Sequence, residues 1–199
     1  MKTIGLDKAE VESTTAFLDI AAQNLDRVII DLNQILALKH SADLKRELIN
    51  FSTLLSEVKL SIVDSNNEAN VTISGDFTGL EEITSVKSYL YSIFFNLILN
   101  SIKYHRPDVP PVIEIRSLSV NNKIQLIFKD NGLGIDLKKC GDSVFKLYKR
   151  FHNHVEGKGM GLFMVKTQVD LLGGRITLTS EVNKGSEFRI EFEETKEAH

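Results

Sequence analysis

The stretch from Tyr89 to Gly161 most constrains this chain, because three polar clusters interrupt its apolar segments at ordered intervals. The first cluster runs from Asn96 to Tyr104, the second from Asp130 to Ile135 and the third from Gly157 to Leu162. The first has the pattern of a helix, and the other two are glycine-containing turns. Such a set contains the amide, carboxylate, lysine and backbone N–H groups needed to hold a nucleotide with magnesium.

The first cluster places polar groups on one side of an otherwise apolar helix. Asn96, Asn100 and Lys103 lie about one turn apart, so they share a face. Amides beside a buried face need hydrogen-bonding partners or a ligand. An amide oxygen can complete a magnesium shell that water and phosphate mostly fill, and Lys103 is placed to offset phosphate charge. Taken alone, the pattern also fits two ordinary surface asparagines.

The second cluster joins a carboxylate to two glycines. Asp130 follows an apolar strand and precedes Gly132 and Gly134. At the bottom of a pocket, the carboxylate could accept a hydrogen bond from a purine amino group, while the glycines let the backbone approach the base. A common Asp-Asn-Gly turn is the alternative.

The third cluster has glycines at alternate positions just before a predicted helix. Backbone N–H groups at such a helix start bind phosphate oxygens, so Gly157, Gly159 and Gly161 indicate a phosphate loop. The cluster does not follow a strand, as a dinucleotide-binding motif would. It also lacks the Lys-Ser or Lys-Thr pair that completes a Walker loop.

Residues 11–38 have the apolar spacing of one long helix with a heptad seam. We expect half of a helical hairpin that dimerises, and the alternative is a helix packed on its own domain.

The other expected elements are a strand within 43–51, a helix over 52–63 capped by Ser52, a strand at 71–73 ending in a loop at Gly75–Asp76, a strand at 82–86, a helix from Ser85 or Ser88 to Tyr104, a hairpin of 112–118 with 123–129, a mobile segment at 136–158 with a helical piece near 142–148, a helix over 159–172, and a hairpin of 175–180 with 187–193. This order predicts an α+β fold, a two-layer sandwich whose mostly antiparallel sheet is covered by helices on one face.

Composition excludes several classes of protein. A net charge of −3 gives no reason to expect a nucleic-acid partner. The single cysteine, Cys140, cannot form an intrachain disulfide and fits a reducing compartment. No apolar run approaches the ~20 residues that a membrane span needs. The expected location is therefore cytoplasmic, with a membrane anchor elsewhere in a longer protein left open.

Together, the three clusters resemble the ATP-binding domain of bacterial sensor histidine kinases, within the wider family shared with gyrase, mismatch-repair and chaperone ATPases. The first cluster resembles the N box of that family, and the second and third resemble its two glycine boxes. Residues 145–152 resemble the phenylalanine box of the kinases, and the segments 173–176 and 185–188 also fit. The resemblance covers roughly residues 43–193 and implies the Bergerat-type ATP-binding fold.

The resemblance also implies roles for single residues, with ATP and Mg²⁺ as cofactors. Asn100 would ligate magnesium, Asp130 would accept from the adenine amino group, and Arg150 would steady the γ-phosphate unless it is only a solvated charge. The implied catalytic residues are Asn96, Lys103 and Arg150. The implied nucleotide-binding residues are Asn96, Asn100, Lys103, Tyr104, Asp130, Gly132, Gly134, Ile135, Gly157, Lys158, Gly159, Met160, Gly161 and Leu162.

Asn96 separates two subclasses of the family. The family's ATP hydrolases typically carry a glutamate at this position that activates water, and an asparagine cannot act as that base. Phosphoryl transfer relies mainly on positioning and charge neutralisation. We therefore expect a phosphotransferase whose own ATP hydrolysis is very slow.

The chain lacks the histidine box that these kinases phosphorylate. No such box surrounds any of the five histidines, which are His40, His105, His152, His154 and His199. Helix 11–38 resembles the second helix of the dimerisation hairpin in these kinases. The resemblance thus implies that residues 1–40 form part of that hairpin, 43–193 the ATP-binding domain and 194–199 a disordered tail. Such a piece would bind ATP without phosphorylating itself.

Expected partners are a response-regulator receiver domain, the upstream dimerisation helix and a second copy bound through helix 11–38. The alternatives are a serine-kinase-type regulator and a degenerate nucleotide-binding interaction module of the same fold.

Overall fold

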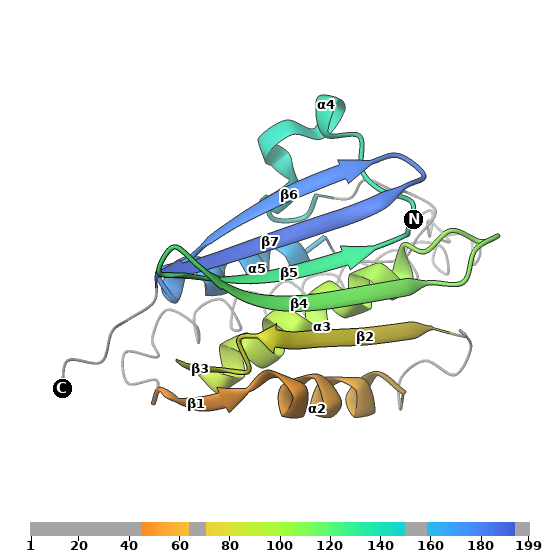
Figure 1. Ribbon diagram of the computed structural model, residues 1–199. Helices are drawn as coiled ribbons and strands as arrows, with labels where there is room; N and C mark the ends of the chain where they lie inside the picture. The colour runs from red at the N-terminus through yellow and green to blue at the C-terminus, as the bar shows by residue number, and fades with distance from the viewer. Residues whose placement is uncertain (1–44, 64–70, 150–158, 194–199) are drawn as a thin grey trace, which may run out of the picture. The chain divides into compact units, whose positions relative to one another are not determined.

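A five-stranded sheet with helices on one face forms the body of the protein (Figure 1). The computed structural model describes residues 45–63, 71–149 and 159–193. The sheet order is β2-β4-β5-β7-β6, built from β2 (Thr72–Gly79), β4 (Val112–Val120), β5 (Lys123–Asp130), β7 (Gly185–Glu193) and β6 (Arg175–Glu181). Only β2 pairs parallel, with β4, and the other three pairings are antiparallel. The predicted α+β sandwich with a mostly antiparallel sheet is confirmed.

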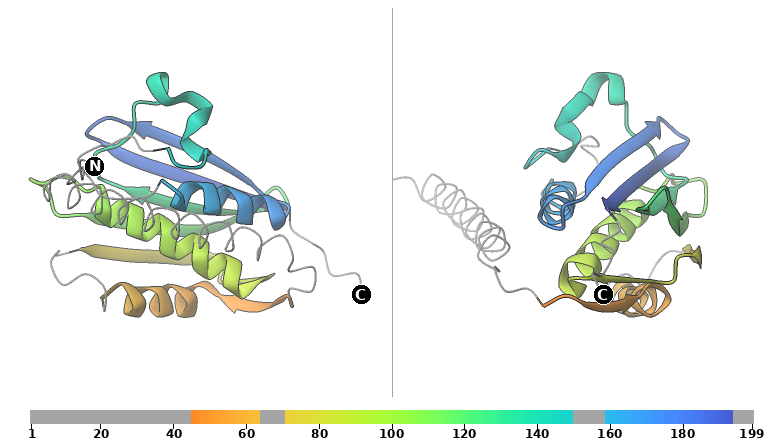
Figure 2. Two further views of the ribbon diagram at one scale, coloured as in Figure 1. Left: turned by 180° about the vertical axis from the view of Figure 1, so that it is seen from behind. Right: turned by 60° about the vertical axis from the view of Figure 1, so that its left-hand side comes forward.

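The helical layer consists of α3 (Lys87–Lys103) and α5 (Gly161–Leu171), which lie together on the same face of the sheet (Figure 2). The helix α2 (Phe51–Val63) contacts both α3 and β2. A small separate sheet pairs β1 (Glu47–Asn50) antiparallel with β3 (Glu82–Ser85). The segment after β5 forms α4 (Leu137–Cys140) and a 3₁₀ helix, η1 (Gly141–Phe145).

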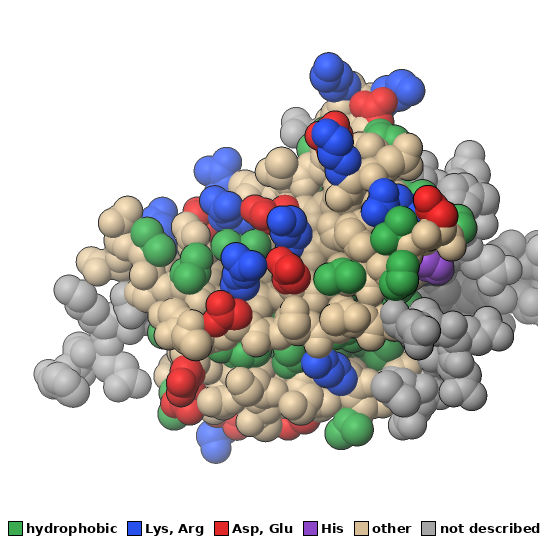
Figure 3. All heavy atoms as spheres, turned by 45° about the vertical axis from the view of Figure 1, so that its right-hand side comes forward, with side chains coloured by type: hydrophobic (Ala, Val, Ile, Leu, Met, Phe, Trp, Pro, Cys, Tyr) green, Lys and Arg blue, Asp and Glu red, His purple; other side chains and the backbone are tan. Residues whose placement is uncertain are grey.

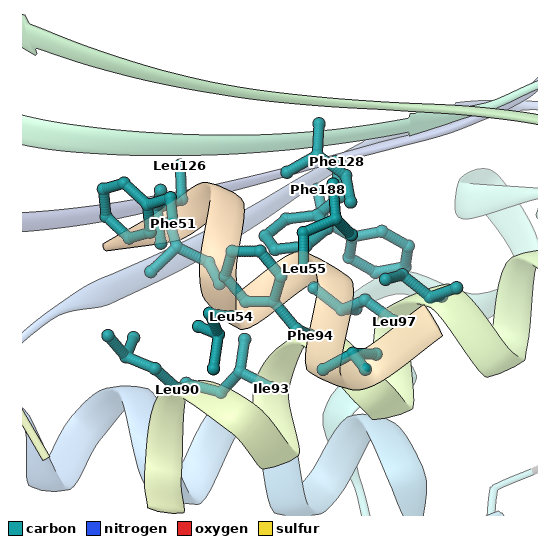
Figure 4. Packing of buried hydrophobic residues seen from close by; sticks show 14 of the residues in the cluster. Phe51, Leu54, Leu55, Leu90, Ile93, Phe94, Leu97, Leu126, Phe128 and Phe188 are labelled. Atoms are coloured by element: carbon teal, nitrogen blue, oxygen red, sulfur yellow. The ribbon is translucent and has the colours of Figure 1, made fainter. Parts of the chain in front are cut away.

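The core lies between the sheet and α3, as Figure 4 shows. In β4 and β5 every second residue points inward, so Ile115 and Phe128, which are paired across the two strands, both face the core. The rings of Phe94 in α3 and Phe128 form a T-shaped pair with 4.9 Å between centroids, and Phe94 stacks on Phe51 at 6.2 Å. Burying side chains of this size contributes about 1.5–3 kcal/mol each, so α3 is fixed against the sheet along its apolar face.

Both predicted hairpins are present. Asn121 and Asn122 join β4 to β5 with positive φ angles of 54° and 60°, the conformation that a two-residue hairpin turn requires. The turn between β6 and β7 uses Asn183 at φ 62° and Gly185 at φ 106°. Because β7 pairs with β5 on its other side, this second turn lies close to the end of β5.

Several predicted element starts are wrong. The side chain of Asn50, rather than Ser52, caps α2, because its Oδ1 accepts from the backbone N–H of Thr53 at 3.1 Å. The N-cap of α3 is Val86, without a side-chain hydrogen bond, so neither Ser85 nor Ser88 starts that helix.

Two other boundaries differ as well. The loop expected at Gly75–Asp76 belongs to β2, which continues to Gly79 because it pairs with β4, with a register shift after Asp76. The helical piece expected near 142–148 begins earlier, at Leu137, where the side chain of Asp136 accepts from the N–H groups of Lys138 and Lys139. The predicted helix 11–38 and the tail 194–199 lie outside the described residues.

The other face of the sheet carries interspersed acidic and basic side chains (Figure 3). Across β4, β5 and β7 one row reads Glu114, Lys129 and Glu187. In the next row Arg116 and Arg189 flank a residue of β5, and each arginine pairs with the glutamate two residues before it on its own strand. Within the described ranges, no helix is long and apolar enough to cross a membrane.

Candidate functional site

One cavity brings the described parts of all three polar clusters together. Its volume is about 320 Å³, which lies within the usual range for small-molecule sites. It is lined by Asn96, Leu99, Asn100, Ser101, Lys103, Tyr104, Asp130, Gly134, Ile135, Lys149, Gly159, Met160, Gly161, Leu162, Ser186 and Phe188. The cavity therefore lies between the second half of α3, the end of β5 and the start of α5.

The wall formed by α3 carries the amides of the first cluster. Asn96 donates through Nδ2 to the Ser92 carbonyl oxygen at 2.8 Å, which orients its side chain along the helix. A Cβ added at Gly161 would lie 3.1 Å from Oδ1 of Asn96 and 3.4 Å from Nδ2 of Asn100. The backbone at the start of α5 thus approaches both asparagines, and glycine is the residue that leaves room for them there.

The inner end of the cavity is built around Asp130. Its Oδ1 accepts from the backbone N–H groups of Gly132 at 2.8 Å and Ser186 at 3.2 Å, and its Oδ2 lies 3.3 Å from the Ser101 hydroxyl. Burial raises the pKa of Asp130 and outweighs these three hydrogen bonds, which lower it. The structure thus presents a partly buried, oriented carboxyl group to the cavity.

Two glycines allow the turns around Asp130 to pack closely. Gly134 and Gly185 both have positive φ angles, of 65° and 106°. A Cβ at Gly185 would collide with the carbonyl oxygen of Asp130, and one at Gly134 would collide with that of Glu181. Side chains at either position would therefore separate the end of β5 from the β6–β7 turn.

Backbone hydrogen bonds join those turns to the end of α3. The Leu133 N–H donates to the Tyr104 carbonyl oxygen at 2.9 Å, and the Asn183 N–H donates to the Leu133 carbonyl oxygen at 2.7 Å. Arg106 adds hydrogen bonds to the carbonyl oxygens of Asn131 at 3.0 Å and Asn183 at 2.9 Å. The three segments that surround Asp130 are therefore held as one unit.

The opposite side of the cavity is formed where residues 148–149 meet Gly159, the first described residue of the third cluster. Gly159 has a φ of 70°, and a Cβ there would lie 2.6 Å from the carbonyl oxygen of Lys149. Tyr148 has a φ of 60°, an uncommon conformation for a residue other than glycine. This close packing brings Lys149 to the cavity, where it adds a second lysine to Lys103.

The structure brings together eleven of the residues singled out from the sequence, namely Asn96, Asn100, Lys103, Tyr104, Asp130, Gly134, Ile135, Gly159, Met160, Gly161 and Leu162. Gly132 is not among the lining residues, but its N–H holds Asp130. Arg150, Gly157 and Lys158 lie outside the described residues.

Sequence reasoning missed Leu99, Ser101, Lys149, Ser186 and Phe188, which also line the cavity. Ser101 could have been found from its place beside Asn100 on an apolar helix. Lys149 and Phe188 lie in the segments 145–152 and 185–188, which resemble family motifs, but that resemblance assigned neither residue to the nucleotide site.

The donor groups in the cavity fit a magnesium–nucleotide. Asn100 offers an amide oxygen, a hard neutral ligand that suits an ion held mainly by phosphate oxygens and water. Lys103 and Lys149 offer positive charge for phosphates, and Asp130 offers an acceptor for an amino group.

Comparisons with known proteins agree with this arrangement. Residues 85–196 match the model of the family described as "Histidine kinase-, DNA gyrase B-, and HSP90-like ATPase". Sensor protein RprX of Bacteroides fragilis is 32% identical over 105 residues, covering 51% of this chain and 20% of RprX. Sensor protein kinase WalK of Staphylococcus saprophyticus is 25% identical over 190 residues, covering 90% of this chain and 30% of WalK. The chain thus spans between 20% and 45% of the length of these curated relatives and of WalK from Staphylococcus aureus.

Solved structures show the same fold. Full-length ShkA in complex with AMPPNP has a TM-score of 0.69 at 20% identity, covering 94% of this chain and 39% of ShkA. Histidine kinase ThkA in complex with the response regulator protein TrrA has a TM-score of 0.66 at 18% identity, covering 96% of this chain and 54% of ThkA.

Proposed function

Since this chain belongs to the histidine kinase-, DNA gyrase B- and HSP90-like ATPase family, we propose that it binds Mg-ATP in the cavity and donates the γ-phosphate to a histidine in two-component signalling. The observation that carries this proposal is the meeting of Asn96, Asn100, Lys103, Asp130 and Gly161 around one cavity. The similarity to the sensor proteins RprX and WalK supports the sensor histidine kinase class.

Each end of the cavity has a proposed task. At the inner end, Asp130 accepts a hydrogen bond from the adenine amino group. At the outer end, Asn100 supplies a ligand to Mg²⁺, and Lys103 offsets phosphate charge, with Lys149 as a further candidate. When bound, the magnesium ion neutralises phosphate charge during transfer.

Asn96 favours transfer to a protein over hydrolysis. Its amide donates to the Ser92 carbonyl oxygen, and an amide has no basic site with which to take a proton from water. The chain therefore positions the nucleotide and leaves the attacking group to be supplied by another domain. This is the arrangement expected of a phosphotransferase whose acceptor histidine lies elsewhere.

The rest of the signalling assembly follows from the same proposal. The acceptor histidine lies on a dimerisation helix upstream of this sequence, so the chain does not phosphorylate itself. Residues 11–38 pack with that helix and with a second copy, which a monomer at high protein concentration would contradict. The onward partner is a response-regulator receiver domain, as supported by the complex of ThkA with TrrA. The proposed location is the cytoplasm, where ATP is available.

Calorimetry with AMPPNP, with and without magnesium, tests the proposal. The wild-type chain should bind in a magnesium-dependent manner. Asp130→Ala should abolish binding, and Asn100→Ala should remove its dependence on magnesium. Asp170→Ala is the matched control, because Asp170 is an exposed aspartate on α5 whose ion pair among the described residues is with Lys166.

Two results would contradict the proposal. One is wild-type-like binding by Asp130→Ala. The other is rapid ATP hydrolysis by the chain that Asn100→Ala does not change. If binding behaves as expected, the longer protein with its upstream helix should form phosphohistidine when given ATP.

A further inference from the structure

Ser101 is a buried polar residue on the apolar face of α3. It is 8% exposed, lies between the buried residues Ile98 and Ile102, and contributes to the wall of the cavity. Its hydroxyl has two acceptors within reach, the Leu97 carbonyl oxygen at 3.0 Å and Oδ2 of Asp130 at 3.3 Å. Ser101 lies within the first polar cluster but is not among the nucleotide-binding residues that the family resemblance implies.

A hydroxyl has one hydrogen, so Ser101 can donate to only one of these acceptors at a time. The contact with Leu97 is a bond to the carbonyl four residues earlier, which many helical serines make. The contact with Asp130 is different, because it joins α3 to the end of β5. The hydroxyl can therefore turn between a helix carbonyl and the carboxylate without moving the backbone.

The two oxygens of Asp130 are not equivalent. Oδ1 accepts two backbone N–H groups, from Gly132 and Ser186, and these fix the carboxylate plane. Among the described residues, the hydrogen bond recorded for Oδ2 comes from Ser101. Oδ2 is thus the oxygen with acceptor capacity left for a ligand.

We propose that Ser101 is a positioning residue for base recognition: its hydroxyl donates to Oδ2 of Asp130 and holds that oxygen ready to accept from the amino group of an adenine base. This inference rests on the proposed function and deepens it, since it adds a residue that selects bases with an exocyclic amino group. Ser101 itself does not need to touch the nucleotide.

The charge on Asp130 is part of this role. Among the described residues, the other titratable side chains lining the cavity are Lys103, Tyr104 and Lys149. None of these is among the causes that shift the pKa of Asp130; burial raises it, and hydrogen bonds, including that of Ser101, lower it. Removing the hydroxyl therefore raises the pKa of Asp130 further and weakens the ionised form that accepts best.

The test compares Ser101→Ala with wild type by calorimetry across the pH range from weakly acidic to neutral. The probes are AMPPNP and the triphosphate of purine riboside, which lacks the 6-amino group. Ser56→Ala is the matched control, because Ser56 makes the same kind of bond to the Ser52 carbonyl oxygen, at 2.9 Å, on the exposed side of α2. Thermal unfolding of each variant checks that it is folded.

At neutral pH, Ser101→Ala should weaken AMPPNP binding by about threefold to tenfold, the effect of one hydrogen bond. The pH at which AMPPNP binding is half lost should move upward, because Asp130 then takes up its proton at higher pH. Binding of the purine riboside triphosphate should change much less, since it does not use Oδ2. Ser56→Ala should behave as wild type with both probes.

Equal losses for the two probes would overturn the inference, as would an unchanged pH midpoint. If Ser101→Ala binds like wild type while Asp130→Ala does not bind, only the role of Ser101 fails and the proposed function stands. If the wild-type chain binds neither probe, both fail.

Discussion

At the scale of the residue, Asp130 combines two opposed properties. Its carboxylate is oriented by two backbone N–H groups and a serine hydroxyl, which suits it to recognise an amino group. Yet burial outweighs those hydrogen bonds and raises its pKa above the value in an unfolded chain. The ionised side chain therefore lowers the stability of the nucleotide-free fold.

Asp130→Asn should separate the two properties. An asparagine keeps an acceptor for both N–H groups and carries no charge, so the nucleotide-free variant should unfold at a higher temperature than wild type at neutral pH. Each 1 kcal/mol gained corresponds to about 2–4 °C. Nucleotide binding should be lost, because an amide N–H₂ cannot accept from the base.

The pH dependence follows from the sign of the shift. A carboxyl group with a raised pKa binds protons more tightly in the folded state, so stability falls as pH rises from its unfolded to its folded pKa. The advantage of Asp130→Asn should therefore be largest near neutral pH and shrink as the pH falls and the wild-type carboxyl takes up its proton. Thermal unfolding at several pH values measures this, and a variant less stable than wild type at neutral pH would contradict it.

At the scale of the element, α3 serves the core and the cavity with two different faces. Its apolar side carries Phe94 and Leu97 against the sheet, and its polar side carries Asn96, Asn100 and Lys103 into the cavity. The position of the amides thus depends on how firmly the apolar side is packed.

Leu97→Ala should cost about 2–5 kcal/mol of unfolding free energy, because Leu97 is 1% exposed and its truncation leaves a cavity in the core. The same substitution at Leu60, which is 71% exposed on α2, should change stability by less than about 0.5 kcal/mol. Urea unfolding of both variants provides the comparison. Equal effects would show that α3 is not the packed element described above.

The helix period was sufficient to predict α3 and the common face of Asn96, Asn100 and Lys103, because those relations are set within one element. The starts of helices were harder, since Asn50 caps α2 one residue before its first turn and α3 starts without a side-chain cap. The length of β2 depends on its parallel neighbour β4, which is distant in sequence. Lys149 and Phe188 lie in segments that resemble family motifs, but their place in the cavity is set by tertiary packing, which a local pattern does not give.

At the scale of the whole molecule, Arg106 ties together segments that are far apart in the sequence. Its guanidinium donates to the carbonyl oxygens of Asn131, 25 residues away, and Asn183, 77 residues away. Those residues adjoin Asp130 and the turn that precedes β7. Arg106 thus couples the end of α3 to both turns at the inner end of the cavity.

Arg106→Ala should lower the unfolding free energy by about 1–2 kcal/mol and weaken AMPPNP binding as well. Arg106→Lys should restore little of either, because an ammonium group cannot reproduce the fixed fork of a guanidinium. Arg175→Ala, at an exposed position where β6 begins, is the control and should leave both unchanged. If Arg106→Lys matches wild type in both urea unfolding and calorimetry, the paired hydrogen bonds to Asn131 and Asn183 are not needed for stability or for binding.

The order of strands in the sheet also sets when the proposed ATP-binding cavity is complete during synthesis of the chain. The last described strand, β7, lies between β5 and β6, and its Ser186 N–H completes the hydrogen bonds of Asp130. A chain still emerging from the ribosome therefore has α3, β5 and the start of α5 before it has a finished pocket. We therefore expect that the growing chain does not bind ATP until residues 185–193 have been synthesised. Nucleotide binding should then have no effect on the earlier steps of folding.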